Sequence, residues 1–441
     1  MALPSGSSGA PARTVGEDVS NPWPRSPSLP VTILLDVEGR SALRSVGMLS
    51  RKALLPLALL AAGCSKEPDE APVQEPNPFQ EVVDQGATRY FGKTQVTEET
   101  KDDAGVITYT FDPSSGPVCL KGEPYQMSVR DTGSEDLFIF LQGGGACWST
   151  FCLAINEAQY GIPAKLDILD PDKPTNPVAG WSTVFFPYCD GSLFAGDADH
   201  DDDGDGTPDR RQRGLANLSA GLDVAATRFP SPKRIVLAGS SGGGYGTILA
   251  TLLVRSKFPG VELLVFDDAG VGLGRPGDEA FISGLFDEWN ARSLLPKTCE
   301  GCTATGHITR LVGWGLERDP KLTVATFSSY RDYVISDVFL GLDADTFRGA
   351  LLEETGAVHA AWPDRYRRFL VDSAVHTTLL GGLEGLVGNN FGAVTFPPDL
   401  ATKLGEIELG GIDSTQVRGV TTATWFKAMI EGSAEWDDRL E

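Results

Sequence analysis

Residues 239–243 read Gly-Ser-Ser-Gly-Gly, a G-x-S-x-G pattern that constrains the fold more than any other in the chain. It follows an apolar run, Arg234 to Ala238, that is typical of a buried strand, and it precedes a helix-like stretch, Gly244 to Val254. A serine in a tight turn between strand and helix needs small neighbours, because larger side chains would collide with either element. The turn lifts the hydroxyl clear of the sheet, and the helix N-terminus favours developing negative charge. The pattern predicts a nucleophile at Ser241, against the alternative of a glycine-rich turn with an incidental serine.

Apolar runs recur along the chain and indicate further strands. Because several of these runs are continuously apolar, they are typical of strands buried on both faces of a parallel sheet. Helical stretches at 214–229 and 245–258 separate the later runs. This alternation predicts an α/β fold, with a mostly parallel sheet and helices on both faces. The expected strands are residues 106–111, 136–141, 183–188, 234–238, 261–266 and 322–327.

Charge and length limit the classes of function. The 441 residues carry a net charge of −23, so no basic face is available to neutralise the phosphates of a nucleic acid. The same charge would repel polyanions such as unesterified pectin. We expect a globular monomer with no nucleic-acid partner.

Residues 48–64 have the order of a bacterial lipoprotein signal peptide. A positive segment at 48–52 precedes an apolar segment at 53–60, and small residues then lead to Cys64. The apolar segment is too short to remain as a membrane-spanning helix. We expect translation to start at Met48, with residues 1–47 a non-native or disordered extension, and lipidation at Cys64. The alternative is a buried apolar helix.

The signal peptide implies export, to a lipid-anchored position on the bacterial cell envelope or to the medium. A Pro- and Glu-rich tether is expected at 65–79, followed by one catalytic domain at 80–441. Removing Cys64 from the seven cysteines leaves six, an even number that can form three disulfides in an oxidising compartment. Cys299 and Cys302 form a C-x-x-C and are expected to form a disulfide; the alternative is a zinc site, but no second such motif or histidine pair completes one.

Three consecutive glycines follow the expected strand 136–141. In lipase-type hydrolases such a loop aims main-chain N–H groups at the oxygen of the reacting ester. We expect Gly144 and Gly145 to donate there, together with Gly242 after the nucleophile. The alternative is a flexible turn.

The general base must be one of four histidines. The usual hydrolase order places the acid and then the histidine after the serine, which both His359 and His376 satisfy. His376 is preferred, because a base on the loop after the last strand meets the nucleophile at the carboxyl rim of the sheet. His200 lies in an acidic run, and His307 precedes the later strands.

The acid should follow the second expected strand after the nucleophile strand. Asp332 lies after the strand 322–327 and is the preferred candidate. Asp267, Asp268 and Asp337 compete with it.

Five ordered motifs together resemble the pectin acetylesterase family of Notum-like α/β-hydrolases. The resemblance covers roughly residues 105–440 and implies an α/β-hydrolase fold with O-deacylation by a Ser–Asp–His triad. It assigns Ser241 as nucleophile, Asp332 as acid and His376 as base. It also implies two disulfides, Cys119–Cys189 and Cys147–Cys152. The motifs are 142–148 (QGGGACW), 187–191 (PYCDG), 239–243 (GSSGG), 266–270 (FDDAG) and 373–376 (SAVH).

The chain departs from the family pattern at two positions. Gly242 replaces the usual alanine after the nucleophile, a change that keeps the main-chain donor. Gly145 replaces a bulky aromatic residue of the oxyanion loop, which would reshape the acyl pocket.

An acidic stretch at 197–209 resembles the calcium loops of dockerin and thrombospondin type-3 repeats. Alternating carboxylates around a central glycine supply the hard oxygen ligands that calcium requires. We expect a structural calcium ion, whereas the alternative is a solvated acidic loop. The expected ligands are Asp201, Asp203, Asp205 and Asp209.

Together these features predict an exported serine esterase that hydrolyses O-acyl esters, with acetyl the expected acyl group and a small molecule or a polysaccharide the expected alcohol. No cofactor is expected for the chemistry, and membrane contact is expected only through the lipid anchor. Two alternatives stay open: a carboxylesterase or lipase acting on other acyl esters, and a non-catalytic, calcium-stabilised surface lipoprotein that binds glycans.

Overall fold

The computed structural model describes residues 76–381 and 407–441. The predicted extension, the signal peptide with Cys64 and residues 65–75 of the tether lie outside these ranges. The described residues belong to one compact unit. Within the described ranges, no helix is both long enough and apolar enough to span a membrane.

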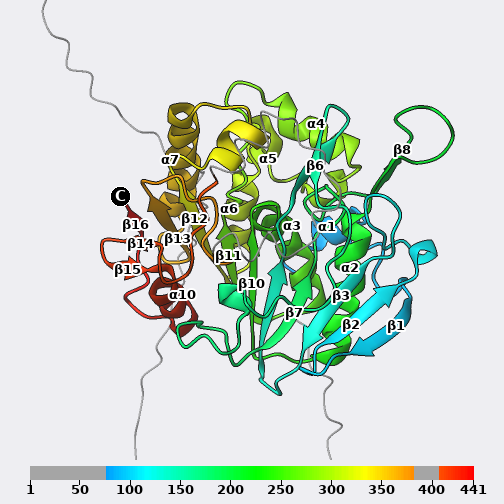
Figure 1. Cartoon of the computed structure of the whole chain (residues 1–441). Coiled ribbons are helices and arrows are strands. Elements are labelled where there is room, and N and C mark those ends of the chain that lie inside the picture. Colours follow the sequence, from blue (N-terminus) through cyan, green and yellow to red (C-terminus); the bar gives the residue numbers. More distant parts are fainter. Residues whose placement is uncertain (1–75, 382–406) are drawn as a thin grey trace, which may run out of the picture. The chain divides into compact units, whose positions relative to one another are not determined.

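A ten-stranded mixed sheet organises the unit, running from β1 at the right of Figure 1 to β16 at the left. The seven strands from β7 to β16 are parallel, and β1, β2 and β3 add an antiparallel edge. In spatial order the strands are β1 (Val96–Lys101), β2 (Ile107–Phe111), β3 (Gln126–Arg130), β7 (Ser182–Phe186), β4 (Asp136–Leu141), β10 (Arg234–Ser240), β11 (Glu262–Asp268), β12 (Leu322–Ser329), β13 (Tyr366–Val371) and β16 (Arg439–Leu440).

Short hairpins and helices complete the unit. The hairpins are β5 (Gly145–Trp148) with β6 (Phe151–Ala154), β8 (Ala198–His200) with β9 (Arg210–Gln212), and β14 (Gln416–Val417) with β15 (Val420–Thr421). The α-helices are α1 (Gln80–Asp84), α2 (Gly214–Arg228), α3 (Gly242–Lys257), α4 (Ala280–Glu288), α5 (Gly301–Ala304), α6 (Thr309–Arg318), α7 (Ala344–Ala361) and α10 (Thr422–Glu431). A π-helical turn, η4 (Val334–Phe339), follows β12, and 3-10 turns occur at η1 (Pro113–Ser115), η2 (Asp167–Leu169) and η3 (Arg292–Leu294).

Alternate side chains of the central strands enter two separate cores. In β10, Ile235 and Leu237 pack with apolar residues of α2, α3, α6 and α7, whereas Val236 and Ala238 pack with those of α10. Because successive side chains of a strand point to opposite faces, helices cover both faces of the sheet. The predicted α/β-hydrolase-like fold is therefore confirmed.

The N-terminal boundary of the unit differs from the prediction by a few residues. Phe79, the last residue of the predicted tether, is fully buried and its ring lies 5.5 Å from that of Trp314. The side chain of Asn77 donates to Ser256 on α3. The last residues of the predicted tether thus belong to the folded unit, because a large aromatic side chain follows the Pro-rich stretch.

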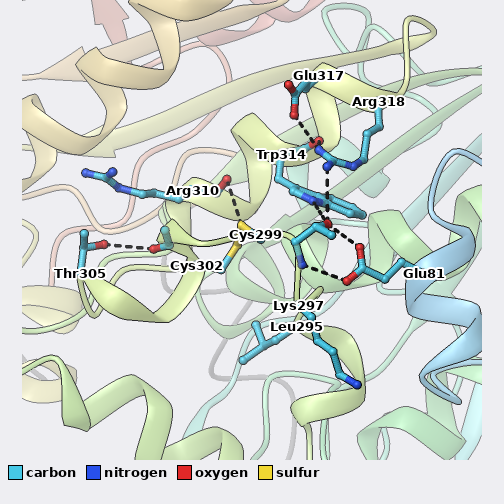
Figure 2. Close-up of a disulfide and its surroundings, with 12 residues drawn as sticks. Glu81, Leu295, Lys297, Cys299, Cys302, Thr305, Arg310, Trp314, Glu317 and Arg318 are labelled. Carbon is cyan, nitrogen blue, oxygen red and sulfur yellow. Dashed lines mark hydrogen bonds and ion pairs between the residues drawn. A yellow bond between two sulfur atoms is a disulfide. The ribbon is translucent and has the colours of Figure 1, made fainter. Parts of the chain in front are cut away.

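The six cysteines form three disulfides, Cys119–Cys189, Cys147–Cys152 and Cys299–Cys302, as predicted. Figure 2 shows the third, between the segment before α5 and α5 itself. Beside it, the carboxylate of Glu81 on α1 accepts the N–H of Thr298 at 2.9 Å. Arg318 lies over the ring of Trp314 at 4.2 Å. The bond from Thr298 to Glu81 attaches α1 to the segment before α5, whereas the contact of Arg318 with Trp314 lies within α6.

Candidate active site

Ser241 occupies the single position between β10 and α3. Its φ of 57° and ψ of −120° are rare for a residue with a side chain, and such strain concentrates at functional turns. Small neighbours are required there. A Cβ on Gly239 would lie 2.3 Å from the carbonyl oxygen of Gly243, and one on Gly243 would lie 2.1 Å from that of Leu141. The strand–serine–helix turn that the sequence predicts is therefore present, together with the reason for its flanking glycines.

The three predicted oxyanion donors lie together beside Ser241. A Cβ on Gly242 would lie 2.9 Å from the carbonyl oxygen of Gly145 and 3.7 Å from the nitrogen of Gly144. Within residues 76–381 and 407–441, the N–H groups of Gly144 and Gly242 donate to no acceptor, so they remain available to a ligand. A Cβ on Gly145 would lie 1.8 Å from the carbonyl oxygen of Leu153, and its φ is +88°. Only glycine fits this position.

His376 and Asp332 form a buried pair. Nδ1 of His376 lies 2.9 Å from both carboxylate oxygens of Asp332, whose side chain is fully buried. The same carboxylate accepts the N–H of Ile335 in η4. When Nδ1–H donates to Asp332, Nε2 is the unprotonated nitrogen of the neutral imidazole. This is the arrangement that a general base requires.

The other three histidines have different surroundings. His359 lies on α7, where its Nδ1 is 2.9 Å from the carbonyl oxygen of Tyr366. His307 accepts the N–H of Gly274, and burial lowers its pKa. His200 lies in β8. Of the four histidines, His376 is the one paired with a buried carboxylate at the carboxyl rim of the sheet.

Asp268 joins the nucleophile turn to the histidine loop. Its carbonyl oxygen accepts the N–H of Ser241 at 2.8 Å. Its carboxylate accepts the hydroxyl of Ser240 at 2.6 Å and the N–H groups of Thr378 and Leu379 at 2.9 and 3.0 Å. Burial raises the pKa of Asp268 to about 6, although these donors favour the ionised form. The residue considered as a competing acid thus connects two loops instead of accepting the bond from His376.

Asp267 and Asp337, the remaining candidates, lie elsewhere. Asp267 accepts the N–H of Gly270 and the hydroxyl of Thr326, and burial raises its pKa to about 7. Asp337 lies further along, within η4.

A small apolar pocket adjoins Ser241. Its cavity volume is about 50 Å³. A single water needs on the order of 10–15 Å³ on the same measure, so the pocket suits a group of a few heavy atoms. The hairpin β5–β6 and the π-helical turn η4 supply most of its walls. π-Helical turns are often found at functional sites. The lining residues are Gly145, Ala146, Phe151, Leu153, Leu193, Ser241, Gly242, Tyr245, Val334, Ile335, Val338 and Phe339.

Aromatic rings close one side of this pocket. Phe339 lies 5.4 Å from Tyr245 and 6.0 Å from Trp148, measured between ring centroids. Trp148 stacks on Phe151 at 4.5 Å, and Phe281 of α4 contacts both Trp148 and Phe339. The pocket therefore ends at a packed wall.

Three of the four predicted calcium ligands converge in the acidic loop. Asp201, Asp203 and Asp209 each offer an oxygen, and these oxygens lie within 4.8 Å of one another. Calcium binds oxygens at about 2.3–2.6 Å, so ligands on one ion can lie up to ~5 Å apart. Asp205 is not part of this group, and its carboxylate accepts the N–H of Thr207. The donor set fits a calcium ion.

Two features of the site are not evident in the sequence. The sequence marks Asp268 only as a candidate acid, although its position at the end of β11, beside β10, is a signal of contact with the nucleophile turn. The pocket wall on η4 has no motif that marks it.

The profile of the Pectinacetylesterase family matches residues 98–276. This span includes Gly144, Gly145, Ser241 and Gly242 but neither Asp332 nor His376. Two curated relatives from Xenopus laevis are similar to the chain. Palmitoleoyl-protein carboxylesterase notum1' is 26% identical over 176 residues, with a coverage of 34% of this chain and 34% of the relative. Palmitoleoyl-protein carboxylesterase notum2 is 25% identical over 176 residues, with the same coverage of 34% on both sides.

The chain thus spans about a third of the length of these relatives. The matched span holds β10, the Ser241 turn, the oxyanion glycines and two of the disulfides. Over residues 98–276 the chain is therefore similar to the Pectinacetylesterase family, and its fold is that of an α/β-hydrolase.

Proposed function

We propose that the chain is a serine esterase that hydrolyses O-acyl esters with a small acyl group. The observation that carries this proposal is the buried pair of His376 and Asp332 at the rim where β10 ends in the strained turn of Ser241. The match to the Pectinacetylesterase family and the similarity to carboxylesterases support the same reaction class.

The proposed reaction has two half-reactions. Nε2 of His376 takes the proton of Ser241 as Oγ attacks the ester carbonyl, and the N–H groups of Gly144, Gly145 and Gly242 stabilise the oxyanion. The tetrahedral intermediate collapses to an acyl-serine, and His376 returns the proton to the departing alcohol. A water then attacks the acyl-serine, again with His376 as base, and releases the carboxylic acid. Asp332 orients the imidazole and stabilises its protonated form.

The size of the acyl group follows from the pocket. A cavity of about 50 Å³ that ends at Phe339 accommodates an acetyl group but not a chain of many carbons. The two relatives are named for a palmitoleoyl group, so this chain is proposed to differ from them in acyl length. The family name points to an acetylated polysaccharide as the alcohol. The net charge of −23 favours a neutral or esterified glycan over a polyanion.

Export and calcium binding remain part of the proposal. Three disulfides support an oxidising compartment, and the motif ending at Cys64 provides the anchor. The acidic loop would bind a calcium ion through Asp201, Asp203 and Asp209. This ion would stabilise the β8–β9 region and take no part in the chemical step.

A panel of esters tests the function. The purified protein should hydrolyse p-nitrophenyl acetate faster than the octanoate and palmitate, and should release acetate from acetylated xylan or pectin. The Ser241→Ala variant, checked for folding by its melting temperature, should be inactive. A folded wild-type protein that hydrolyses none of these esters but still binds glycans would favour the non-catalytic alternative.

A further inference from the structure

The hairpin β5–β6 carries much of the proposed catalytic machinery. It begins at Gly145, one of the oxyanion donors, and contributes Ala146, Phe151 and Leu153 to the pocket. A hairpin of two four-residue strands is marginally stable by itself, so its position depends on outside contacts. Those contacts come from the end of α4 and from the hairpin β8–β9.

One anchor is the carbonyl oxygen of Cys147 in β5. It accepts hydrogen bonds from Nε2 of Gln212 in β9 at 2.5 Å and from Nε1 of Trp289 at 2.8 Å. Both donor residues are fully buried. The N–H of Cys147 donates to the carbonyl oxygen of Gly191 at 2.7 Å. Three hydrogen bonds to the main chain of Cys147 therefore hold the middle of β5.

A second anchor holds the tip of the hairpin. The carboxylate of Glu288 accepts the N–H of Ser149 at 2.6 Å and its hydroxyl at 3.0 Å. Arg210 of β9 donates to the same carboxylate at 3.1 Å. The guanidinium of Arg210 also donates to both carboxylate oxygens of Asp202, at 2.6 and 2.8 Å. Arg210 is 4% exposed, so a buried guanidinium bridges two partly exposed carboxylates through charge-assisted hydrogen bonds.

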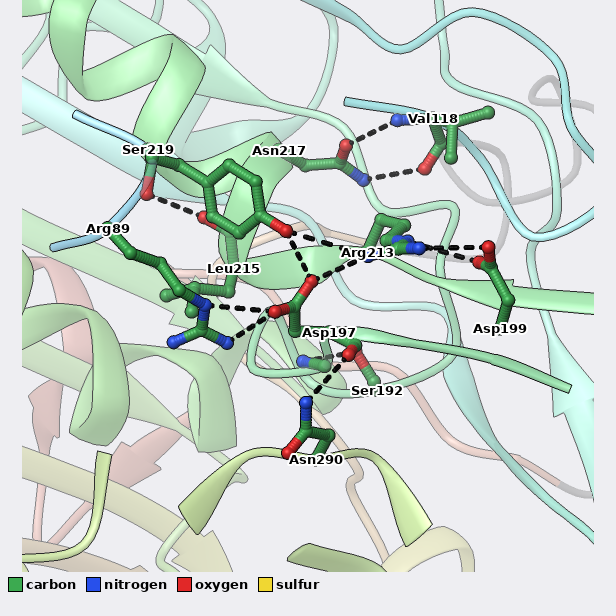
Figure 3. A network of polar contacts seen from close by, with 12 residues as sticks. Arg89, Val118, Ser192, Asp197, Asp199, Arg213, Leu215, Asn217, Ser219 and Asn290 are labelled. Carbon is green, nitrogen blue, oxygen red and sulfur yellow. Dashed lines mark hydrogen bonds and ion pairs between the residues drawn. The ribbon is translucent and has the colours of Figure 1, made fainter. Parts of the chain in front are cut away.

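The base of the β8–β9 hairpin is attached to Trp289 and Asn290, directly after Glu288 at the end of α4. Figure 3 shows Asp197 between Arg89 and Arg213, with Asn290 nearby. The N–H of Asp197 donates to the carbonyl oxygen of Trp289 at 2.7 Å, and the side chain of Asn290 donates to the carbonyl oxygen of Asp197 at 3.0 Å. Residues 288–290 thus bond to Arg210 of β9 and to Asp197 before β8. They also bond to the hairpin β5–β6, which we call the oxyanion hairpin.

We propose that Arg210 is a positioning residue of the esterase, which sets the oxyanion hairpin through Glu288 and links that hairpin to the acidic loop through Asp202. Arg210 touches no reacting atom. It acts through Ser149 and the strand β5, and a displaced hairpin moves Gly145 and the wall of the pocket together. This inference rests on the proposed function for its catalytic consequence, whereas the effect on the hairpin is independent of it.

The test compares Arg210→Gln with Arg211→Gln. Arg211 is the next residue of β9, and its guanidinium contacts the carbonyl oxygen of Pro208 and no part of the oxyanion hairpin. Glutamine removes the charge that Arg210 shares between its two acids. We expect a roughly ten- to a hundredfold lower kcat for p-nitrophenyl acetate, since small displacements of catalytic groups have effects of this size. KM should change little, and Arg211→Gln should keep wild-type values.

Hydrogen exchange supplies a readout that needs no activity. Peptides covering residues 145–154 should lose protection in Arg210→Gln and keep it in Arg211→Gln, whereas peptides from β10 and β11 should be unchanged in both. If Arg210→Gln folds poorly, Glu288→Gln provides the second variant, because it weakens the same bridge and keeps an acceptor for Ser149.

The outcomes separate the two proposals. The inference is overturned if the wild type is active and both Arg210→Gln and Glu288→Gln keep its kcat and its hairpin protection. That result leaves the proposed esterase function intact. A wild type inactive on every ester overturns the proposed function, and the exchange data then still decide whether Arg210 holds the hairpin. An equal loss of kcat in Arg211→Gln would show a general effect of β9 and would also overturn the inference.

Discussion

Thr378 lies two residues beyond the proposed base His376, and its N–H donates a 2.9 Å hydrogen bond to the carboxylate of Asp268. The residue that receives this bond also accepts the N–H of Ser241 through its main-chain carbonyl oxygen. One fully buried residue therefore sets the position of both the nucleophile turn and the histidine loop.

Asp268→Asn should lower kcat/KM for p-nitrophenyl acetate roughly ten- to a hundredfold, because the amide cannot accept all three side-chain bonds. Asp267→Asn is the matched control, since Asp267 is equally buried, next in sequence and bonded to neither loop. Burial raises the pKa of Asp268 to about 6, so the wild-type carboxylate is ionised above that pH and neutral below it. Since asparagine resembles the neutral form, the ratio of wild-type to variant activity should shrink as the pH falls below about 6. A constant ratio would contradict this role.

His376→Ala should be as damaging as loss of the serine, on the order of a million-fold in kcat, because both half-reactions need the base. His359→Ala should be mild, since that imidazole contacts the carbonyl oxygen of Tyr366 and is not hydrogen-bonded to Asp332. Steady-state kinetics on both variants, with melting temperatures to check folding, decide the assignment. A lethal His359→Ala with an active His376→Ala would reverse it.

Phe339→Ala should extend the acyl pocket. Each additional buried methylene contributes about 0.8 kcal/mol, so the ratio of kcat/KM for the butyrate to that for the acetate ester should rise roughly tenfold. Phe281→Ala is the control, because Phe281 belongs to the same aromatic wall but does not line the pocket. An unchanged ester preference in Phe339→Ala would mean that the acyl chain lies elsewhere.

Calcium should raise the melting temperature of the wild-type protein, and a chelator should lower it, because an ion that binds only the native state stabilises it by mass action. The Asp203→Ala, Asp205→Ala double variant should lose this response. Asp364→Ala, which removes a carboxylate whose side chain is 96% exposed on another surface, should keep it. Equal melting temperatures with calcium and with chelator would leave a solvated acidic loop. Turnover of the folded calcium-free wild type should change little.

Local sequence patterns predict the central strands well and the edge poorly. The apolar runs that became β4, β10, β11 and β12 are buried on both faces, so the requirement for apolar residues shows directly in the sequence. The strand β1 reads VTEETK and is mostly exposed, with no apolar alternation to mark it. Its place in the sheet is set by pairing with β2, which no local pattern in the sequence predicts.

In the candidate site, too, features set by local contacts are predictable and features set by distant contacts are not. Ser241 and the glycines around it are set by contacts within a few residues, so a motif can identify them. The choice of Asp332 over Asp268 depends on which carboxylate meets His376 across 44 residues, and no spacing rule supplies that. Arg210 is still harder to identify, because its partners are far apart in the sequence: Asp202 lies in the acidic loop and Glu288 at the end of α4.

The central claim is that Ser241 carries the acyl group during turnover. Protein treated with a fluorophosphonate, which reacts with activated serines, should gain one adduct, and peptide mass spectrometry should place it on Ser241. His376→Ala should label far more slowly, and Ser241→Ala should not label at all. An adduct on another residue, or a folded Ser241→Ala protein that still hydrolyses p-nitrophenyl acetate at the wild-type rate, would contradict the account.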